Sequence, residues 1–228
     1  AAATNMIDGK IDAFGIPKTD RLGRFREVME VMKMFWTQDR VTHHGRYFDI
    51  NDVPGAGGAV QKPYPRMYLA ANLERGVLRA ARQADGWLIS SRSTLPTITQ
   101  QTGLYRDAVK KEGKPGFISA WREMFVAETR QKAIDIMRPH VEWMYKDRAA
   151  LGHSQELPEA DRIDVPFDRI LEGRFILGSP EECIEEIEKY RELGIDELVL
   201  RCQWPGMPNK DSLRALELFG DKVLPHYR

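Results

Sequence analysis

Two short polar segments, each directly after an apolar run, hold the residue types most suited to chemistry in this chain. Residues 72–74 (Asn-Leu-Glu) follow the apolar run 67–71, and residues 90–92 (Ser-Ser-Arg) follow the run 87–89. Helix-start amides, hydroxyl groups and a guanidinium are groups that hold phosphate in proteins. Both segments also have a purely structural interpretation, in which the asparagine only caps a helix and the arginine is only solvated in a loop. Spacing alone favours that interpretation, because most helix caps hold no ligand.

One strand–helix–strand unit would position both segments. Residues 67–71 are apolar without interruption, as expected of a strand buried on both faces. The next residues predict a helix capped by Asn72, with an apolar stripe at three- and four-residue steps: Leu73, Val77, Ala80, Ala81 and Ala84. Asp85-Gly86 ends this helix, and a second buried strand follows. Parallel strands joined in this way bind ligands beyond their carboxyl ends, so both polar segments are expected on one rim.

Strands and helices alternate along the rest of the chain, which predicts an α/β architecture. Periodicity and turn residues predict helices over 22–36, 95–112, 129–145 and 212–223, a hairpin over 40–50, and strands over 117–127 and 195–200. Pro139 is expected to kink or split the third of these helices, because proline lacks an amide donor. The clearest local signal is a capping box, in which Ser179 caps, Pro180 takes the first helical position and Glu182 follows.

The charge balance and the cysteine content bound the class of protein. Lysine plus arginine and aspartate plus glutamate number 34 each among 228 residues, so no net field attracts nucleic acid or an anionic membrane. No apolar run approaches the length of a membrane span, and no signal-peptide pattern opens the chain. Cys183 and Cys202 suit a reducing compartment, which predicts a cytoplasmic protein. His43 and His44 would point to opposite sides of an extended chain, so no metal site is predicted.

Several segments together resemble the luciferase-like family of flavin-dependent monooxygenases. Their order and spacing over residues 20–225 carry the resemblance: RFREVMEVMKMFW, HGRYFDI, QKPYP, ADGW, FVAETRQKA, GSPEECIEEIEKYRELGIDELVL and RCQWPGMP. The resemblance implies a (β/α)8 TIM barrel. In this interpretation residues 1–228 form a single domain, with a helical insertion region at about 128–175.

Only part of such a barrel can be placed on this sequence. Four strands are expected, at 67–71, 87–90, 119–127 and 195–200, so the chain should match the last two-thirds of a family member. The earlier strands would then precede Ala1. Because four strands cannot close a barrel, the missing strands either lie outside this sequence or come from another chain, and the former is favoured.

The resemblance also implies a cofactor site at the carboxyl ends of the strands, for FMN or, in one branch of the family, a deazaflavin coenzyme. The residues expected to approach its tail and phosphate are Ala70, Ala71, Asn72 and Glu74. Many relatives carry a glycine pair and a serine or threonine there, which this chain lacks. The residues expected to assist the phosphate or line the substrate mouth are Ser90, Ser91 and Arg92.

Two residues after the last strand complete the expected site. Arg201 and Gln203 would face the flavin ring or the substrate, and the alternative for Arg201 is an ion pair with a neighbouring carboxylate. The family's residues that act on the substrate lie largely on the early strands, so no catalytic acid or base is assigned.

The leading hypothesis is therefore a monooxygenase that uses reduced FMN and oxygen to oxidise a small organic substrate, with reduced flavin supplied by a separate reductase. The first alternative is an oxidoreductase that transfers hydride with a deazaflavin coenzyme of the F420 type. The second is a flavin-binding or purely structural relative without turnover. A homodimer is expected from the family, and neither nucleic acid nor a membrane is expected as a partner.

Overall fold

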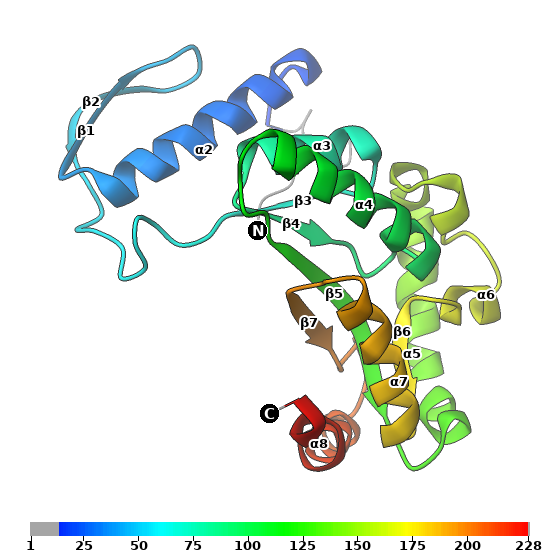
Figure 1. Cartoon of the computed structure of the whole chain (residues 1–228). Helices are drawn as coiled ribbons and strands as arrows, with labels where there is room; N and C mark the ends of the chain where they lie inside the picture. Colours follow the sequence, from blue (N-terminus) through cyan, green and yellow to red (C-terminus); the bar gives the residue numbers. More distant parts are fainter. Residues whose placement is uncertain (1–13, 228) are drawn as a thin grey trace. The chain divides into compact units, whose positions relative to one another are not determined.

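Residues 14–227 are described by the computed structural model, and their contacts divide them into two compact units, with the boundary between Met67 and Tyr68. The smaller unit holds a 3-10 turn, one helix and one antiparallel hairpin (Figure 1): Lys18–Asp20, α2 (Arg21–Thr37), β1 (Arg40–His44) and β2 (Asp49–Pro54). Glu27 on α2 accepts from the backbone amide of Phe48 at 2.8 Å, which ties the hairpin to the helix. The predicted helix and hairpin are confirmed. The expected single domain stays a prediction, and its residues 1–13 and 228 lie outside the described part.

The larger unit is built around a parallel sheet (Figure 1): β3 (Tyr68–Ala70), β4 (Gly86–Ile89), β5 (Ile118–Val126), β6 (Phe175–Gly178) and β7 (Glu197–Arg201). Ala120 of β5 pairs with both β4 and β7, which therefore lie on opposite edges of β5. Glu123 pairs with both β6 and β7, so β6 shares the β4 edge. The four predicted strands are confirmed. The short strand β6 was not predicted, because four apolar residues carry no readable periodicity.

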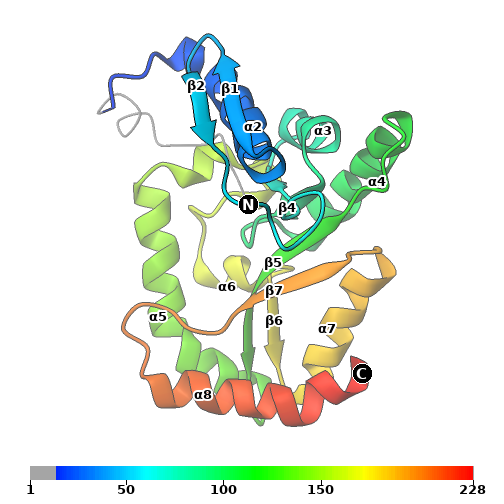
Figure 2. The same cartoon turned by 90° about the vertical axis from the view of Figure 1, so that its left-hand side faces the viewer.

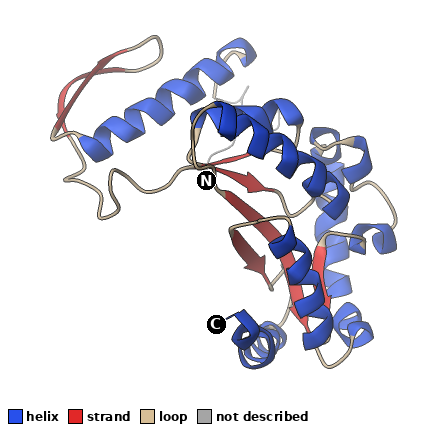
Figure 3. Ribbon diagram, viewed as in Figure 1, coloured by secondary structure: helices blue, strands red, loops and turns tan. Residues whose placement is uncertain are grey.

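Helices connect and cover these strands (Figure 3): α3 (Glu74–Gln83), α4 (Leu95–Lys111), α5 (Arg130–Ala150), α6 (Phe167–Leu171), α7 (Pro180–Glu192) and α8 (Asn209–Leu218). Two 3-10 turns, η2 (His153–Glu156) and η3 (Glu159–Asp161), lie between α5 and α6. A π turn (Phe219–Val223) and a 3-10 turn (Leu224–Tyr227) follow α8. In Figure 2, α8 lies across the carboxyl ends of β5 and β6.

Local sequence signals account for several helix boundaries. Ser179 and Glu182 make the reciprocal bonds of a capping box at the start of α7, as predicted. The Thr129 side chain accepts from the amide of Lys132 at the start of α5. Of the two predicted effects of Pro139, a kink stays a prediction, and a split of the helix is wrong, since α5 runs unbroken from Arg130 to Ala150. Its buried face helps to hold the helix together across the proline, because it packs into an apolar cluster with Phe125, Leu177, Trp204 and neighbouring residues.

Within residues 14–227 no helix has both the length and the apolar character that crossing a bilayer requires.

Candidate cofactor-binding rim

The carboxyl ends of β3 and β4 lie side by side and open a rim of short polar segments. Trp87 of β4 donates its indole N–H to the carbonyl of Ala71 at 3.0 Å. Gln101 of α4 donates to the carbonyl of Asn72 at 2.8 Å. Both bonds hold the backbone of the β3–α3 turn to neighbouring elements.

The structure corrects the prediction that Asn72 caps α3. The capping position belongs to Leu73, which is extended, and the described residues make no side-chain capping bond to α3. Asn72 is instead buried, with its carbonyl bonded to Gln101. Of the other residues expected here, Ala71 is buried, Ala70 is half-buried and Glu74 is exposed at the first position of α3.

Arg92 is not the solvated loop residue that the structural interpretation of the sequence required. Ser90 Oγ accepts from both the Arg92 amide, at 3.2 Å, and Arg92 Nε, at 3.3 Å. The Arg92 Nη1 atom is buried without a hydrogen-bond partner. Burial lowers the pKa of Arg92, the charge of Arg148 lowers it further, and Glu156 and Tyr145 oppose the change. The Arg92 guanidinium therefore keeps one buried nitrogen atom whose hydrogen-bonding capacity is unmet.

Two further arginines, which sequence reasoning missed, donate hydrogen bonds to the backbone of residues 90–93. Arg122 of β5 is fully buried and donates to the carbonyls of Ser90, at 2.6 Å, and Ser93, at 2.8 Å. Arg174, just before β6, is also buried and donates to the carbonyl of Arg92 at 2.8 Å. Neither side chain could be foreseen as buried, because arginine is mostly exposed in folded proteins.

At the end of β7, Arg201 forms the ion pair that was its alternative role. Its Nε donates to Glu123 Oε2 at 2.7 Å, its Nη2 bonds the other carboxylate oxygen, and its guanidinium lies over the Trp121 ring. Trp204 adds an indole N–H bond to Glu123 Oε2 at 3.0 Å. Gln203, in contrast, is exposed and donates to Asn209 at 2.6 Å.

Glu123 is the main residue of this region that sequence reasoning missed. It is fully buried on β5, and its charge is balanced by Arg201 alone among the ion pairs that the structure describes. An adjacent Arg-Glu pair (residues 122 and 123) inside an otherwise apolar strand was the available signal. Because successive strand residues point to opposite faces, Arg122 reaches Tyr190 of α7 while Glu123 faces Trp204.

Tyr145 of α5 brings a neutral hydroxyl close to these charges. Its side chain is buried and its hydroxyl has no hydrogen-bond partner. Burial raises the pKa of Tyr145, the Glu123 carboxylate raises it further, and the nearby arginines act in the opposite direction. The hydroxyl therefore stays protonated at neutral pH and is available as a hydrogen-bond donor.

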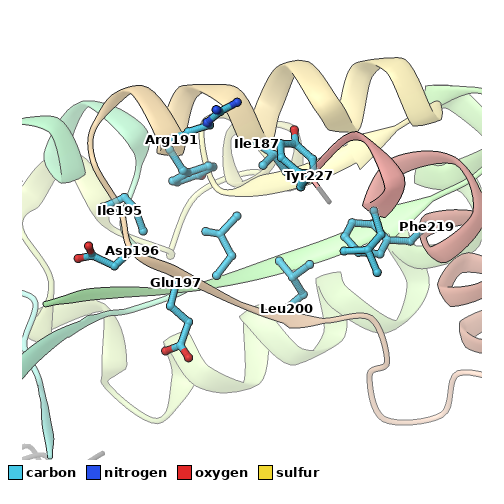
Figure 4. Close-up of a pocket in the computed structure, with 11 residues that line it drawn as sticks. Ile187, Arg191, Ile195, Asp196, Glu197, Leu200, Phe219 and Tyr227 are labelled. Atoms are coloured by element: carbon cyan, nitrogen blue, oxygen red, sulfur yellow. The ribbon is translucent and has the colours of Figure 1, made fainter. Parts of the chain in front are cut away.

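A cavity of about 380 Å³ lies elsewhere, between α7, β7 and the turns after α8 (Figure 4). Its lining is mainly apolar and includes Ile187, Leu198, Leu200 and Phe219. Leu200 faces this cavity, whereas its neighbour Arg201 points to the opposite face of β7, toward Glu123. The cavity is therefore separate from the rim and contains none of the predicted cofactor residues.

The family of the chain follows from comparison with known proteins. A family model described as luciferase-like monooxygenase matches residues 8–197. The chain belongs to this luciferase-like family. Its parallel strands are accordingly part of a barrel of the luciferase-like type, as the sequence predicted.

Individual relatives give the same fold with two different named activities. An F420-dependent glucose-6-phosphate dehydrogenase from Nakamurella multipartita is 28% identical over 221 residues, which cover 92% of this chain and 61% of the relative. A monooxygenase from Streptomyces bottropensis superposes with a TM-score of 0.78 at 24% identity, covering 99% of this chain and 68% of that structure. An F420-dependent secondary alcohol dehydrogenase, solved with an F420–acetone adduct, superposes with a TM-score of 0.72 at 18% identity over 97% and 67% of the two chains.

The luciferase-like chain thus spans about 61% of the length of the curated dehydrogenase. This agrees with the prediction that only part of a barrel is present in the sequence.

Proposed function

We propose that the protein is an oxidoreductase that transfers hydride between a deazaflavin coenzyme of the F420 type and a small organic substrate. The observation that carries this proposal is the match of 92% of the chain to an F420-dependent dehydrogenase. It replaces FMN-dependent oxygenation as the leading hypothesis. Because the chain spans only part of that relative, the proposal concerns the full-length gene product.

The residues at the rim suit the phosphate-bearing tail that such a coenzyme carries. Arg92 holds a buried guanidinium nitrogen without a partner, next to the segment of Ser90 and Ser91. A charge-assisted bond from a guanidinium to a phosphate is among the strongest hydrogen bonds in proteins, and it would satisfy this donor. FMN also carries a phosphate, so this fit supports a flavin or deazaflavin equally and does not choose between them.

The chain's own residues would bind and orient the coenzyme rather than carry out the redox step. The coenzyme itself supplies the hydride chemistry when it is bound. Arg92 would hold the phosphate, and the turn of Ala70, Ala71, Asn72 and Glu74 would lie beside the tail. Arg201 is already engaged by Glu123, so we assign it to shaping the rim and not to direct contact with the ring. Gln203 would reach a ligand only by leaving Asn209.

A second candidate function is FMN-dependent monooxygenation of a small substrate. It is supported by the match of residues 8–197 to the luciferase-like monooxygenase model. This candidate needs a source of reduced flavin, and we keep a separate reductase as its proposed partner. A homodimer and a small-molecule substrate remain proposals under both candidates.

The deciding experiment titrates the full-length gene product with coenzyme F420 and, separately, with FMN, following the fluorescence and absorption of each ring system. We expect F420 to bind the more tightly, and reduced F420 to appear when glucose 6-phosphate or a secondary alcohol is supplied as substrate. Tighter FMN binding with oxygen-dependent product would instead establish the monooxygenase. Failure to bind either ring would reject both candidates and leave the alternative of a purely structural relative without turnover.

The Arg92 assignment is tested in the same titration with Arg92→Gln, which keeps a polar side chain and removes the charge. We expect the coenzyme Kd to rise about 10- to 100-fold, as loss of one charge-assisted hydrogen bond predicts. Arg191→Gln is the matched control, since Arg191 is exposed and, among the ion pairs of the described residues, pairs with Glu188 on the surface of α7. Equal Kd values for Arg92→Gln and the control would remove Arg92 from the phosphate site.

A further inference from the structure

The segment Ser90–Thr94, between β4 and α4, is held along its backbone by buried charged residues from distant parts of the chain. Arg122 donates to the carbonyls of Ser90 and Ser93. Arg174 donates to the carbonyl of Arg92. Because these contacts use the backbone, they fix the path of the segment without engaging the Arg92 side chain. The start of α4 is also fixed by a buried charged residue, Asp161, which follows α5 in the chain.

Asp161 is the last residue of η3 and contacts Thr94 at the start of α4. It is fully buried, and a single carboxylate oxygen, Oδ1, accepts three bonds. The donors are the Thr94 amide at 3.0 Å, the Thr94 hydroxyl at 2.6 Å and the Thr97 hydroxyl at 2.8 Å. Nearby, the Leu95 amide donates to the carbonyl of Gly173 at 2.9 Å. Asp161 and Gly173 therefore accept the hydrogen bonds of the Thr94 and Leu95 amides at the start of α4.

This arrangement has a consequence for ligand binding at the rim. The amino-terminal end of a helix attracts anions, because its amides are free and its dipole is positive there. In α4 that place is taken by the protein's own carboxylate, so a ligand phosphate is directed away from it. Arg92, two residues before Thr94, retains the buried donor without a partner.

We propose that Asp161 is a positioning residue for coenzyme binding: by anchoring Thr94 it holds Arg92 in the geometry that receives the coenzyme phosphate. The proposal rests on the proposed function and assigns the segment after α5 a role in cofactor affinity. The three donors require an acceptor and not a charge as such. An amide oxygen at the same place therefore preserves the anchor, whereas a methyl group abolishes it.

The test compares Asp161→Ala, Asp161→Asn and Asp164→Ala in the full-length gene product. Asp164 is the matched control, because it belongs to the same segment and bonds Ser154 and Arg162 but makes no bond to residues 90–97 among those described. Two readouts are taken from each variant. The first is the Kd for F420 and for FMN, each added alone. The second is hydrogen exchange at the Thr94 and Leu95 amides without any coenzyme.

We expect Asp161→Ala to raise the coenzyme Kd about tenfold and to speed exchange at the Thr94 amide, which loses its acceptor, whereas the Leu95 amide keeps its bond to the Gly173 carbonyl. Asp161→Asn should stay within about threefold of the unsubstituted protein, and Asp164→Ala should match it. A Kd unchanged in Asp161→Ala, or equally raised in Asp164→Ala, would overturn the positioning role.

The two readouts also separate this proposal from the proposed function. If the unsubstituted protein binds neither coenzyme, the proposed function fails, and amide exchange alone decides the anchor. Faster exchange in Asp161→Ala but not in Asp164→Ala then supports the anchoring of Thr94. Equal exchange in the two variants overturns it.

Discussion

Removing either partner of the Glu123–Arg201 pair should destabilise the protein, but by different amounts. Glu123 is fully buried, whereas the Arg201 side chain is 20% exposed. Arg201→Ala leaves a buried carboxylate whose remaining described donor is the Trp204 indole, 3.0 Å away. An uncompensated buried charge costs about 3–5 kcal/mol, and we expect a loss of this size.

Glu123→Ala should cost less, about 1–3 kcal/mol. The guanidinium that loses its partner lies over the Trp121 ring, 4.9 Å from its centroid, and already reaches water. The Arg201 guanidinium can therefore be solvated without unfolding, whereas the Glu123 carboxylate, on the buried strand β5, cannot. The double variant should cost less than the sum of the two single variants, since neither charge is then left alone.

Urea unfolding of the full-length gene product, followed by circular dichroism, measures all three differences. Arg169→Ala is the control, because its pair with Glu172 is exposed on both sides and should contribute less than about 1 kcal/mol. A Glu123→Ala cost equal to or larger than that of Arg201→Ala would contradict the argument from burial. Strict additivity in the double variant would show that the two residues do not interact in solution.

Two further predictions concern α7. Ser179→Ala removes the cap that accepts from the Glu182 amide and should lower the free energy of unfolding by about 1 kcal/mol. Ser179→Asp should retain the cap and most of the stability. Equal urea midpoints for the two variants would contradict the capping role. Burial raises the pKa of Cys183 to about 12, so its thiol stays protonated at neutral pH and gains reactivity only as the pH rises toward that value. Half-buried Cys202 should therefore be alkylated first in the native protein, and mass spectrometry showing equal rates at the two cysteines would refute this.

Features that depend on neighbouring residues in the chain were predictable. The capping box at Ser179 uses atoms three residues apart, and it is present as expected. The strands at 67–71 and 87–90 were recognised because buried parallel strands read as apolar runs, and the strand at 119–127 because apolar and polar residues alternate along it. The family resemblance, which rests on the order of such local segments, is confirmed by the match over residues 8–197.

Features that depend on partners far along the chain were missed or misjudged. Asn72 has the side chain of a helix cap, but Gln101 of α4 holds its backbone and Leu73 takes the capping position. Arg92 has the composition of a solvated loop residue, yet it is half-buried and one of its guanidinium nitrogens is shielded from solvent. No local pattern identifies either partner, because hydrogen bonds between distant segments leave no periodicity in sequence.

By itself, the sequence determined the α/β class, the parallel strands and the polar segments at their carboxyl ends, because periodicity and caps are set within a few residues. Only the tertiary structure decided which of those polar groups are available to a ligand. It joined Glu123 to Arg201 across 78 positions and Asp161 to Thr94 across 67. Burial makes each such group demand a partner, and the fold alone brings that partner within reach.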